Sequence, residues 1–461
     1  MLDIWLGDLA GLTPETDAQT LRDTAGEYRS LGRIDDALRL LDAAESAAVE
    51  RPVAGAGDPL ALIHYARAEL LEQAGRPDAA ARALAEARKV SVARCFAGSA
   101  ADAALLERRI HATGDARAHA LLGHWLYFQR RYAEAIDHLT AAVAGDPADA
   151  VALRGLGLAA YNVQGDPGRA VALYRSAVEA APDDPKLRYE ADQLARRVGV
   201  APEDRLEALA DAGALVAARD DLALAYAELL VLVGRHEEAI DLLAGRRFSP
   251  WEGGEGETIR VWTLAQRAAA EHHLAAGDPA AAITALNSAV HVPDALGEAP
   301  HPLANRSDLL LAFGDAHRAA GNDAESDAAW RAAADSAGDF TTMSAVPHSP
   351  MTYYSVLAAR RLGDTERAER LTTELSAYVE SIRNEHARID YFATSLPTML
   401  IFREDIARTH HDLVAVMDAQ LAILAGRMTA ARTVLEELES RDPADARVRD
   451  LRAQTKTPVG A

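Results

Sequence analysis

The sequence predicts an all-α protein built as a solenoid of helical hairpins with irregular loops, and three observations support this fold class. Alanine, the residue with the highest helix propensity, fills 102 of the 461 positions. A frame of glycine and alanine recurs nine times along the chain. No stretch between turn signals shows the two-residue alternation of a half-buried strand, so we expect no sheet.

The recurring frame consists of a glycine, an alanine five residues later, a large residue four further on and usually a small residue three after that. Clear copies begin at Gly32, Gly75, Gly165, Gly277 and Gly321, weaker ones at Gly234, Gly363 and Gly426, and one copy has Arg130 in the glycine position. Glycine takes the left-handed conformation that ends a helix, and small residues let a second helix approach closely. Each copy therefore predicts a helical hairpin.

Taken in order, the frames divide the chain into four segments. We expect N-terminal hairpins over 1–115, repeats over 116–245, a loop, a hairpin and a proline-rich connector over 246–302, and C-terminal repeats over 303–461. Wide gaps between frames leave room for a further helical pair, such as 185–198 with 202–218. The apolar stretch 222–233 is short and contains Glu228, so it predicts a buried helix and no membrane span.

The spacing resembles the tetratricopeptide repeat, whose helical hairpins stack into a right-handed superhelix. Ala135 and Ala170 occupy the same frame position 35 residues apart, close to the family period of about 34. We expect one continuous solenoid, because each repeat packs mainly on its neighbours. The resemblance implies a concave face that binds peptides or partner domains.

Charge and targeting signals limit the classes of partner. Lysine and arginine number 48 against 70 aspartates and glutamates, a net charge of −22, which argues against nucleic acid and anionic membranes. The N-terminus lacks the features of a signal peptide, so a cytoplasmic protein is predicted. The single cysteine, Cys95, has no internal disulfide partner and is predicted to be a small buried residue.

Three irregular stretches interrupt the frames, and loops often carry function in repeat proteins. The first, 246–257, contains the candidate partner- or ligand-binding residues Arg246, Arg247, Phe248, Trp251, Glu252 and Glu255. In one interpretation Trp251 stacks on a sugar or a partner while the glutamates accept hydrogen bonds; in the other the aromatic residues pack between repeats. The proline-rich stretch 293–302 is predicted to be a spacer. The third, 388–405, adds Tyr391 and Phe392 as candidates, although such apolar clusters are more typical of packing.

These stretches also resemble proteins that carry domain of unknown function 5107. The shared motifs are Arg-Phe followed by Trp-Glu-Gly-Gly-Glu-Gly within 246–256, Leu-Gly-Glu at 296–298, and Asp-Tyr-Phe, Ser-Leu-Pro and Leu-Ile-Phe within 390–402. In that family the tetratricopeptide region usually follows an N-terminal β-sandwich similar to galactose mutarotases. The resemblance implies that this chain is the helical module without the sandwich, and that its partner is a carbohydrate-active domain.

Signatures of catalysis are missing from the sequence. The glycines at 253–256 lack the lysine of a phosphate-binding loop, and the adjacent histidine pairs at 272–273 and 410–411 do not share one helix face as metal ligands would. We expect no cofactor and no metal. Glu252, Glu255 and Glu257 offer the carboxylate pair that glycoside hydrolysis requires. The favoured function is therefore a non-catalytic scaffold for a protein partner, and the alternative is a protein that binds or processes a sugar.

Overall fold

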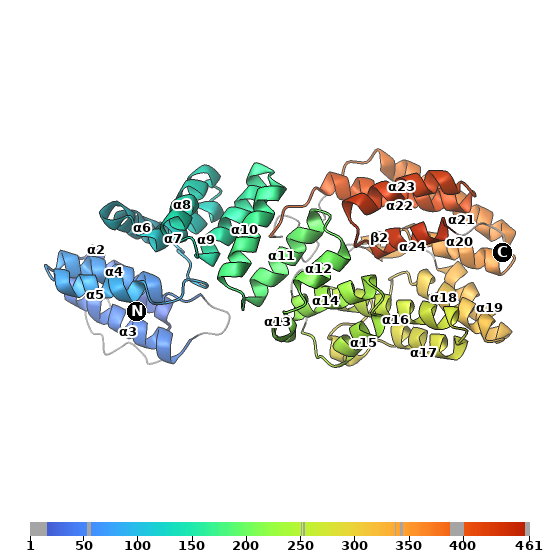
Figure 1. Ribbon diagram of the computed structural model, residues 1–461, viewed down its shortest axis with the longest axis horizontal. Helices are drawn as coiled ribbons and strands as arrows, with labels where there is room; N and C mark the ends of the chain where they lie inside the picture. Colours follow the sequence, from blue (N-terminus) through green and yellow to red (C-terminus); the bar gives the residue numbers. More distant parts are fainter. Residues whose placement is uncertain are drawn as a thin grey trace. The chain divides into compact units, whose positions relative to one another are not determined.

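The computed structural model describes residues 16–52, 57–249, 251, 254–336, 338–341, 344–387 and 401–456. The chain falls into two compact units, Met1–Ala181 and Pro182–Ala461, each built almost entirely of helices (Figure 1). The predicted all-α fold of helical hairpins is confirmed. The segment boundaries expected at residues 115, 245 and 302 stay predictions.

In its described residues, the first unit contains four helical hairpins and one additional helix. The hairpins pair α2 (Ala18–Ser30) with α3 (Ile34–Glu50), α4 (Leu60–Gln73) with α5 (Pro77–Ala87), α7 (Ala116–Phe128) with α8 (Tyr132–Gly145), and α9 (Ala150–Ala159) with α10 (Pro167–Ala180). The additional helix, α6 (Ala100–Thr113), joins the first helices of two hairpins: Asp102 accepts a hydrogen bond from Arg22 of α2 at 3.0 Å, and Arg109 donates to Glu72 of α4 at 2.8 Å.

The second unit begins with α11 (Pro185–Arg197), α12 (Pro202–Ala208) and α13 (Gly213–Ala218), so the helical pair expected at 185–218 is present with its second helix broken in two. Hairpins follow, namely α14 (Asp220–Leu232) with α15 (His236–Ala244), α16 (Glu257–Ala275) with α17 (Pro279–Val290), α18 (Ser307–Ala319) with α19 (Asp323–Asp335), α20 (Thr352–Arg361) with α21 (Thr365–Arg383), and α22 (Ile406–Leu424) with α23 (Met428–Arg441). The last helix, α24 (Ala446–Gln454), lies between the α22–α23 hairpin and helices α16 and α18 in Figure 1.

The turns of the hairpins confirm the role of the recurring frame. All eight frame glycines have positive φ, from 64° at Gly165 to 84° at Gly234. Arg130, which replaces the glycine in the ninth frame, also has a positive φ, 61°, and no other non-glycine residue does so in the described part of the chain. The alanine five residues later is buried in every frame that has one. The hairpin therefore imposes its turn conformation even where the residue is unfavourable.

Several helices begin at an aspartate followed by proline. The side chains of Asp166, Asp184 and Asp278 accept hydrogen bonds from backbone N–H groups in the first turn, at 2.9, 2.8 and 3.0 Å. The proline after each aspartate lies in the first helical turn, where its missing N–H has no partner to lose. Local sequence thus determines where these helices start.

One hairpin has an extra residue in its first helix. Gly123 and Gly314 lie twelve residues before Ala135 and Ser326, the residues at the buried alanine position of their frames. Gly157 lies thirteen residues before Ala170, which has the same position. Each of these glycines faces a large frame residue so closely that a Cβ would come within 2.8 Å of it. The packing is therefore equivalent in all three hairpins, and the extra residue is absorbed in a π-helical turn, Ala160–Gln164.

The expectation of no sheet is wrong at one short hairpin. Strands β1 (Asp339–Thr341) and β2 (Ser344–Val346) pair antiparallel, with Phe340 opposite Ala345. Asp339 fixes this hairpin to its surroundings by accepting hydrogen bonds from the Asn305 N–H at 2.8 Å and the Ser349 hydroxyl at 2.7 Å. Strands of three residues are too short for their alternation to be recognised in a sequence.

The apolar core runs through each unit along the contacts between successive hairpins. Helix α14 is buried from Leu222 to Leu232 except at Tyr226, as predicted for this stretch. Cys95 is also buried, and burial raises the pKa of its thiol to about 12, so it is a packed side chain as expected. No helix within the described ranges is long and apolar enough to cross a membrane.

Candidate functional site

Two irregular stretches that are separate in the sequence meet in the second unit. The Phe248 N–H donates to the carbonyl of Ala295 at 2.8 Å, in the 3₁₀ turn η3 (Asp294–Leu296). Phe248 and Leu296 are buried in one apolar cluster. Both carboxylate oxygens of Glu298 accept from the Gly256 N–H, at 3.1 and 3.0 Å, where α16 begins. The connector predicted to be a spacer therefore also supports the 246–257 loop and supplies an acceptor at the start of α16.

Arg246 contacts the end of α13 and the start of α14. Its Nε donates to Asp220 Oδ1 at 2.7 Å, and its Nη1 donates to the carbonyls of Val216 and Ala217 at 3.1 and 2.9 Å. The guanidinium also lies 5.5 Å from the centre of the Phe248 ring. Because these contacts use the guanidinium inside the unit, they favour a packing role for Arg246.

The remaining candidates of the loop divide between packing and solvent. Trp251 is half-buried against the apolar cluster, and a Cβ on Gly254 would come within 2.0 Å of its ring. Arg247 and Glu255 are exposed. Glu252, Tyr391 and Phe392 lie outside the described residues. The geometry favours the packing interpretation for Phe248 and Trp251, and it leaves Arg247 and Glu255 as the candidates on the surface.

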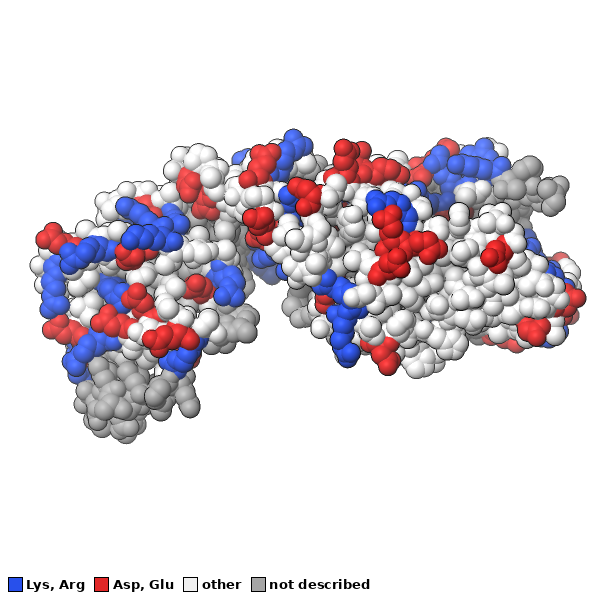
Figure 2. Space-filling model, turned by 60° about the horizontal axis from the view of Figure 1, so that its bottom comes forward, with Lys and Arg blue, Asp and Glu red and all other residues white. Residues whose placement is uncertain are grey.

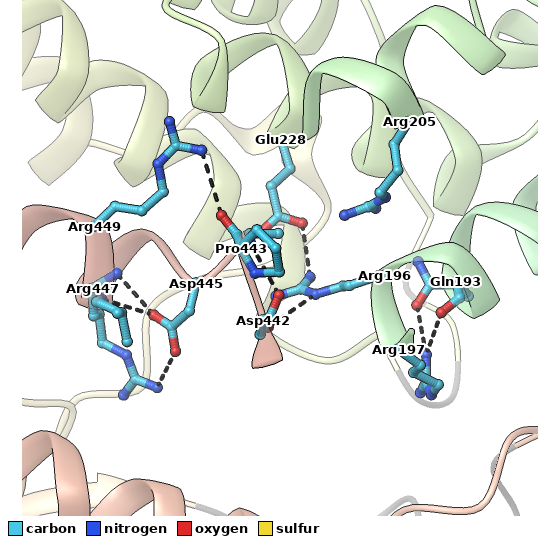
Figure 3. Close-up of polar contacts among 12 residues, drawn as sticks. Gln193, Arg196, Arg197, Arg205, Glu228, Asp442, Pro443, Asp445, Arg447 and Arg449 are labelled. Atoms are coloured by element: carbon cyan, nitrogen blue, oxygen red, sulfur yellow. Dashed lines mark hydrogen bonds and ion pairs between the residues drawn. The ribbon is translucent and has the colours of Figure 1, made fainter. Parts of the chain in front are cut away.

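A network of charges around one buried carboxylate, absent from our sequence-based candidates, joins this loop to distant parts of the second unit. Glu228 of α14 is 6% exposed and lies between two arginines. Arg260 Nη1 is 2.8 Å from one of its oxygens, and Arg196 Nη1 is 3.2 Å from the other. Arg196 also donates to Asp442 at 3.2 Å, in the turn before α24 (Figure 3). Arg260 pairs with Glu257, where the loop ends and α16 begins.

The two central charges of this network, Glu228 and Arg196, stay ionised. Burial by itself would raise the pKa of Glu228, but Arg260 and Arg196 outweigh that effect and hold the pKa below its ordinary value. Burial would lower the pKa of Arg196, but Glu228 and Asp442 raise it. Glu228 and Arg196 are therefore both charged near neutral pH, each held beside an opposite charge. The network is suited to holding helices together, not to acid-base catalysis.

The sequence does contain a signal for this network. A carboxylate inside an apolar helical stretch, such as Glu228, needs a cationic partner when the helix is buried. The identity of that partner is not visible, because Asp442 is 246 positions from Arg196 in the chain. Elsewhere on the surface, acidic and basic side chains are interspersed on the face that Figure 2 shows.

The first unit has an exposed aromatic surface beside the π-helical turn. Phe128, the last residue of α7, is 80% exposed, and Val163 in the π-helical turn is 36% exposed. The Asn162 side-chain amide donates to the Tyr127 hydroxyl at 3.3 Å, and the rings of Tyr127 and Tyr132 are 5.2 Å apart. We call these five residues the aromatic edge. In the sequence, this surface is marked by the thirteen-residue spacing between Gly157 and Ala170, one residue more than in the two equivalent hairpins.

Comparison with known proteins agrees with the repeats. Residues 120–185, which include the aromatic edge, match the family model described as tetratricopeptide repeat. Among solved structures, the chain is similar to YrrB, described as a TPR protein with an unusual peptide-binding site, with 17% identity over 40% of this chain and 91% of that chain, and a TM-score of 0.32. It is similar to Naa15/Naa10 bound to HypK-THB, with 14% identity over 77% of this chain and 57% of that chain, and a TM-score of 0.37. The family match thus identifies tetratricopeptide repeats within residues 120–185, where α7 to α10 form two hairpins.

Proposed function

We propose that this chain is a non-catalytic scaffold that binds a protein partner through the aromatic edge of its first unit. Phe128 carries the proposal, because a phenylalanine 80% exposed in a repeat region presents a large apolar area to solvent. Burying such a side chain on binding contributes about 1.5–3 kcal/mol. Aromatic residues are also the side chains that interfaces most often use as anchors.

The neighbours of Phe128 suit a protein ligand. Val163 adds a second exposed apolar side chain, and Asn162 beside it bonds through its amide to the hydroxyl of Tyr127, the residue before Phe128. Their arrangement follows from the π-helical turn, a feature that occurs frequently at functional sites. A partner segment with an apolar side chain and an adjacent polar group would complement this surface.

The proposal is tested by partner capture with three full-length chains: wild type, Phe128→Glu and the control Leu31→Glu. Leu31 is also exposed, at 60%, beside the turn of another hairpin. We expect a partner that wild type and Leu31→Glu retain and that Phe128→Glu loses. With the purified partner, the affinity should fall at least about tenfold, or about 1.4 kcal/mol. Equal affinity for all three chains would place the contact elsewhere.

The narrower proposal, that the partner is a carbohydrate-active β-sandwich domain, rests on the resemblance to proteins with domain of unknown function 5107. Contact between Gly256 and Glu298, which belong to two of the shared motifs, supports it, because both motifs then contribute to one region of the second unit. Calorimetric titration with a galactose-mutarotase-like domain tests this proposal. Binding that Arg247→Ala weakens would support it, provided that Arg367→Ala, at an arginine of α21 in the same unit, leaves binding unchanged. No binding would contradict it.

The alternative function, binding or processing of a sugar, is tested separately. Glu255 is exposed next to the half-buried Trp251, which favours a solvent-facing role for that part of the loop. Turnover of a glycoside by the purified chain, abolished by Glu252→Gln or Glu255→Gln, would favour the enzyme over the scaffold. We expect no turnover.

A further inference from the structure

The last helix of the second unit is held by residues from four other helices. Arg449 donates to the Leu232 carbonyl at the end of α14 at 2.9 Å, and Asp450 lies 3.6 Å from Arg267 of α16. Further along, the Tyr353 hydroxyl of α20 donates to Gln454 at 2.6 Å, and Arg432 of α23 donates to the Thr455 carbonyl at 2.6 Å. We call the residues that make these contacts, Leu232, Arg267, Tyr353 and Arg432, together with Glu436 and Glu439 of α23, which pair with Arg452, the α24-binding surface.

The apolar part of this contact is small. Val448 and Leu451, three residues apart on one face of α24, are 2% and 0% exposed. They pack in the apolar cluster that α18 to α23 form. The hairpins of that cluster also contact one another directly, as in α19 with α20 and α21 with α22. Docking of α24 therefore adds two anchoring side chains to a core that the hairpins already build.

The polar part of the contact is not optimised for stability. Arg267 donates to Asp308 at 2.9 Å, but its buried Nε has no hydrogen-bond partner among the described residues. The pKa of Asp450 is raised to about 6, chiefly by burial and also by Glu271, Asp308 and Asp445, against the lowering effect of Arg267. The side chain of Asp450 is 36% exposed. Docking thus brings an aspartate near other carboxylates and leaves an arginine donor unused.

Charge complementarity indicates which helices this surface accepts. Three arginines and one aspartate give α24 a positive charge, in a chain whose net charge is −22. Arg452 pairs with Glu436 at 3.5 Å and with Glu439, both on α23. Arg449 adds a bond to a carbonyl at the negative end of the α14 dipole. The surface therefore recognises a basic helix with two apolar anchors.

We propose that the α24-binding surface is a site for a basic helix of a partner protein, in which valine and leucine lie three residues apart between arginines. In the free chain α24 occupies this site, so it acts as an intramolecular competitor of the partner helix. The proposal concerns the second unit and is independent of the aromatic edge. Figure 3 shows the turn from Asp442 to Asp445 through which α24 joins the rest of the unit.

A labelled peptide with the sequence of residues 442–456 serves as the probe, titrated against three full-length chains. Leu451→Asp removes the central anchor of α24, and Leu303→Asp, at a residue 65% exposed in the same unit, is its matched control. We expect the Leu451→Asp chain to bind the peptide at least about tenfold more tightly than wild type and Leu303→Asp. Equal binding to all three chains, or no binding to any, would overturn the proposal.

A second measurement uses only the wild-type chain, so it does not depend on the folding of a variant. Excess peptide should accelerate hydrogen exchange of the amides of residues 447–454, because peptide and α24 compete for one surface. A peptide carrying Leu451→Asp should have no effect. Binding without faster exchange in α24 would place the peptide elsewhere and contradict the proposal. The Phe128→Glu chain should respond to the peptide as wild type does. A negative result here therefore leaves the proposal for the aromatic edge standing, and a negative result there leaves this one standing.

Discussion

Arg196 and Asp442 are 246 positions apart in the chain, yet the Arg196 guanidinium donates to the Asp442 carboxylate at 3.2 Å. Arg196 lies in the last turn of α11, the first helix of the second unit, and Asp442 lies in the turn between α23 and α24. Glu228, bound to the same guanidinium, links this contact to the middle of the unit. The second unit is therefore closed by a polar contact between its beginning and its end.

Arg130 is predicted to be replaceable by glycine with a gain in stability. Its φ of 61° costs a residue with a Cβ about 1–2 kcal/mol, and the extra freedom of glycine in the unfolded chain offsets about 0.5–1 kcal/mol of the gain. Arg130→Gly should raise the free energy of unfolding by about 0.5–1 kcal/mol in urea denaturation. The neighbouring Gln129, with φ of −72°, provides the control: Gln129→Gly should lower it. A loss of stability in Arg130→Gly would be evidence against this explanation of the turn.

Deletion of Val163 is predicted to leave the first unit folded. It returns the spacing between Gly157 and Ala170 from thirteen to twelve residues, the value at Gly123 and Gly314, so a regular helix replaces the π-helical turn. Deletion of His124 from α7, which has no extra residue, should rotate the side chains on one side of the deletion by about 100° and unfold its hairpin. Circular dichroism and thermal melting distinguish the two. Equal loss of helix in both would contradict the extra-residue account.

Docking of α24 is predicted to strengthen on acidification from pH 7 to pH 5. Partial burial raises the pKa of Asp450 from 3.8 to about 6, with Glu271 and Asp308 adding to the shift and Arg267 of α16 opposing it. Tyr354 of α20 also faces this carboxylate. Because the docked state binds the proton more tightly than the released state, protonation favours docking, and the benefit disappears as pH rises through about 6.

The pH effect on α24 is measured by hydrogen exchange of its amides, corrected for the intrinsic dependence of exchange on pH. Asp450→Asn should protect these amides more than wild type at pH 7 and should remove most of the change between pH 5 and pH 7. Asp445 caps α24 through the N–H groups of Arg447 and Val448, so Asp445→Asn is a less specific change. Weaker protection of wild-type α24 at pH 5 than at pH 7 would contradict the sign.

The hairpins could be predicted from the sequence because their determinants are local. A frame glycine, an alanine five residues later and an aspartate before proline each act within one or two helical turns. The rule was strong enough to identify Arg130 as a turn residue without its glycine. The buried position of Cys95 and of the stretch 222–233 followed in the same way from composition.

The contacts between distant segments could not be predicted in this way. Arg196 and Asp442 are ordinary charged residues in the sequence, and only the closure of the unit brings them together. The same holds for Gly256 and Glu298, which belong to stretches that we interpreted separately. The strands at 339–346 were missed because three residues a strand give no readable pattern. The positions of Glu252, Tyr391 and Phe392 stay predictions.

Closure of the second unit is tested most directly by a double-mutant cycle of Arg196→Met and Asp442→Asn, read from the hydrogen exchange of the α24 amides. We predict that each single variant exchanges faster than wild type at residues 447–454. The double variant should be less affected than the sum of the two, with a coupling of about 1 kcal/mol, because both remove one interaction. Unchanged exchange in α24 in the single variants, or strictly additive effects, would contradict closure through this pair.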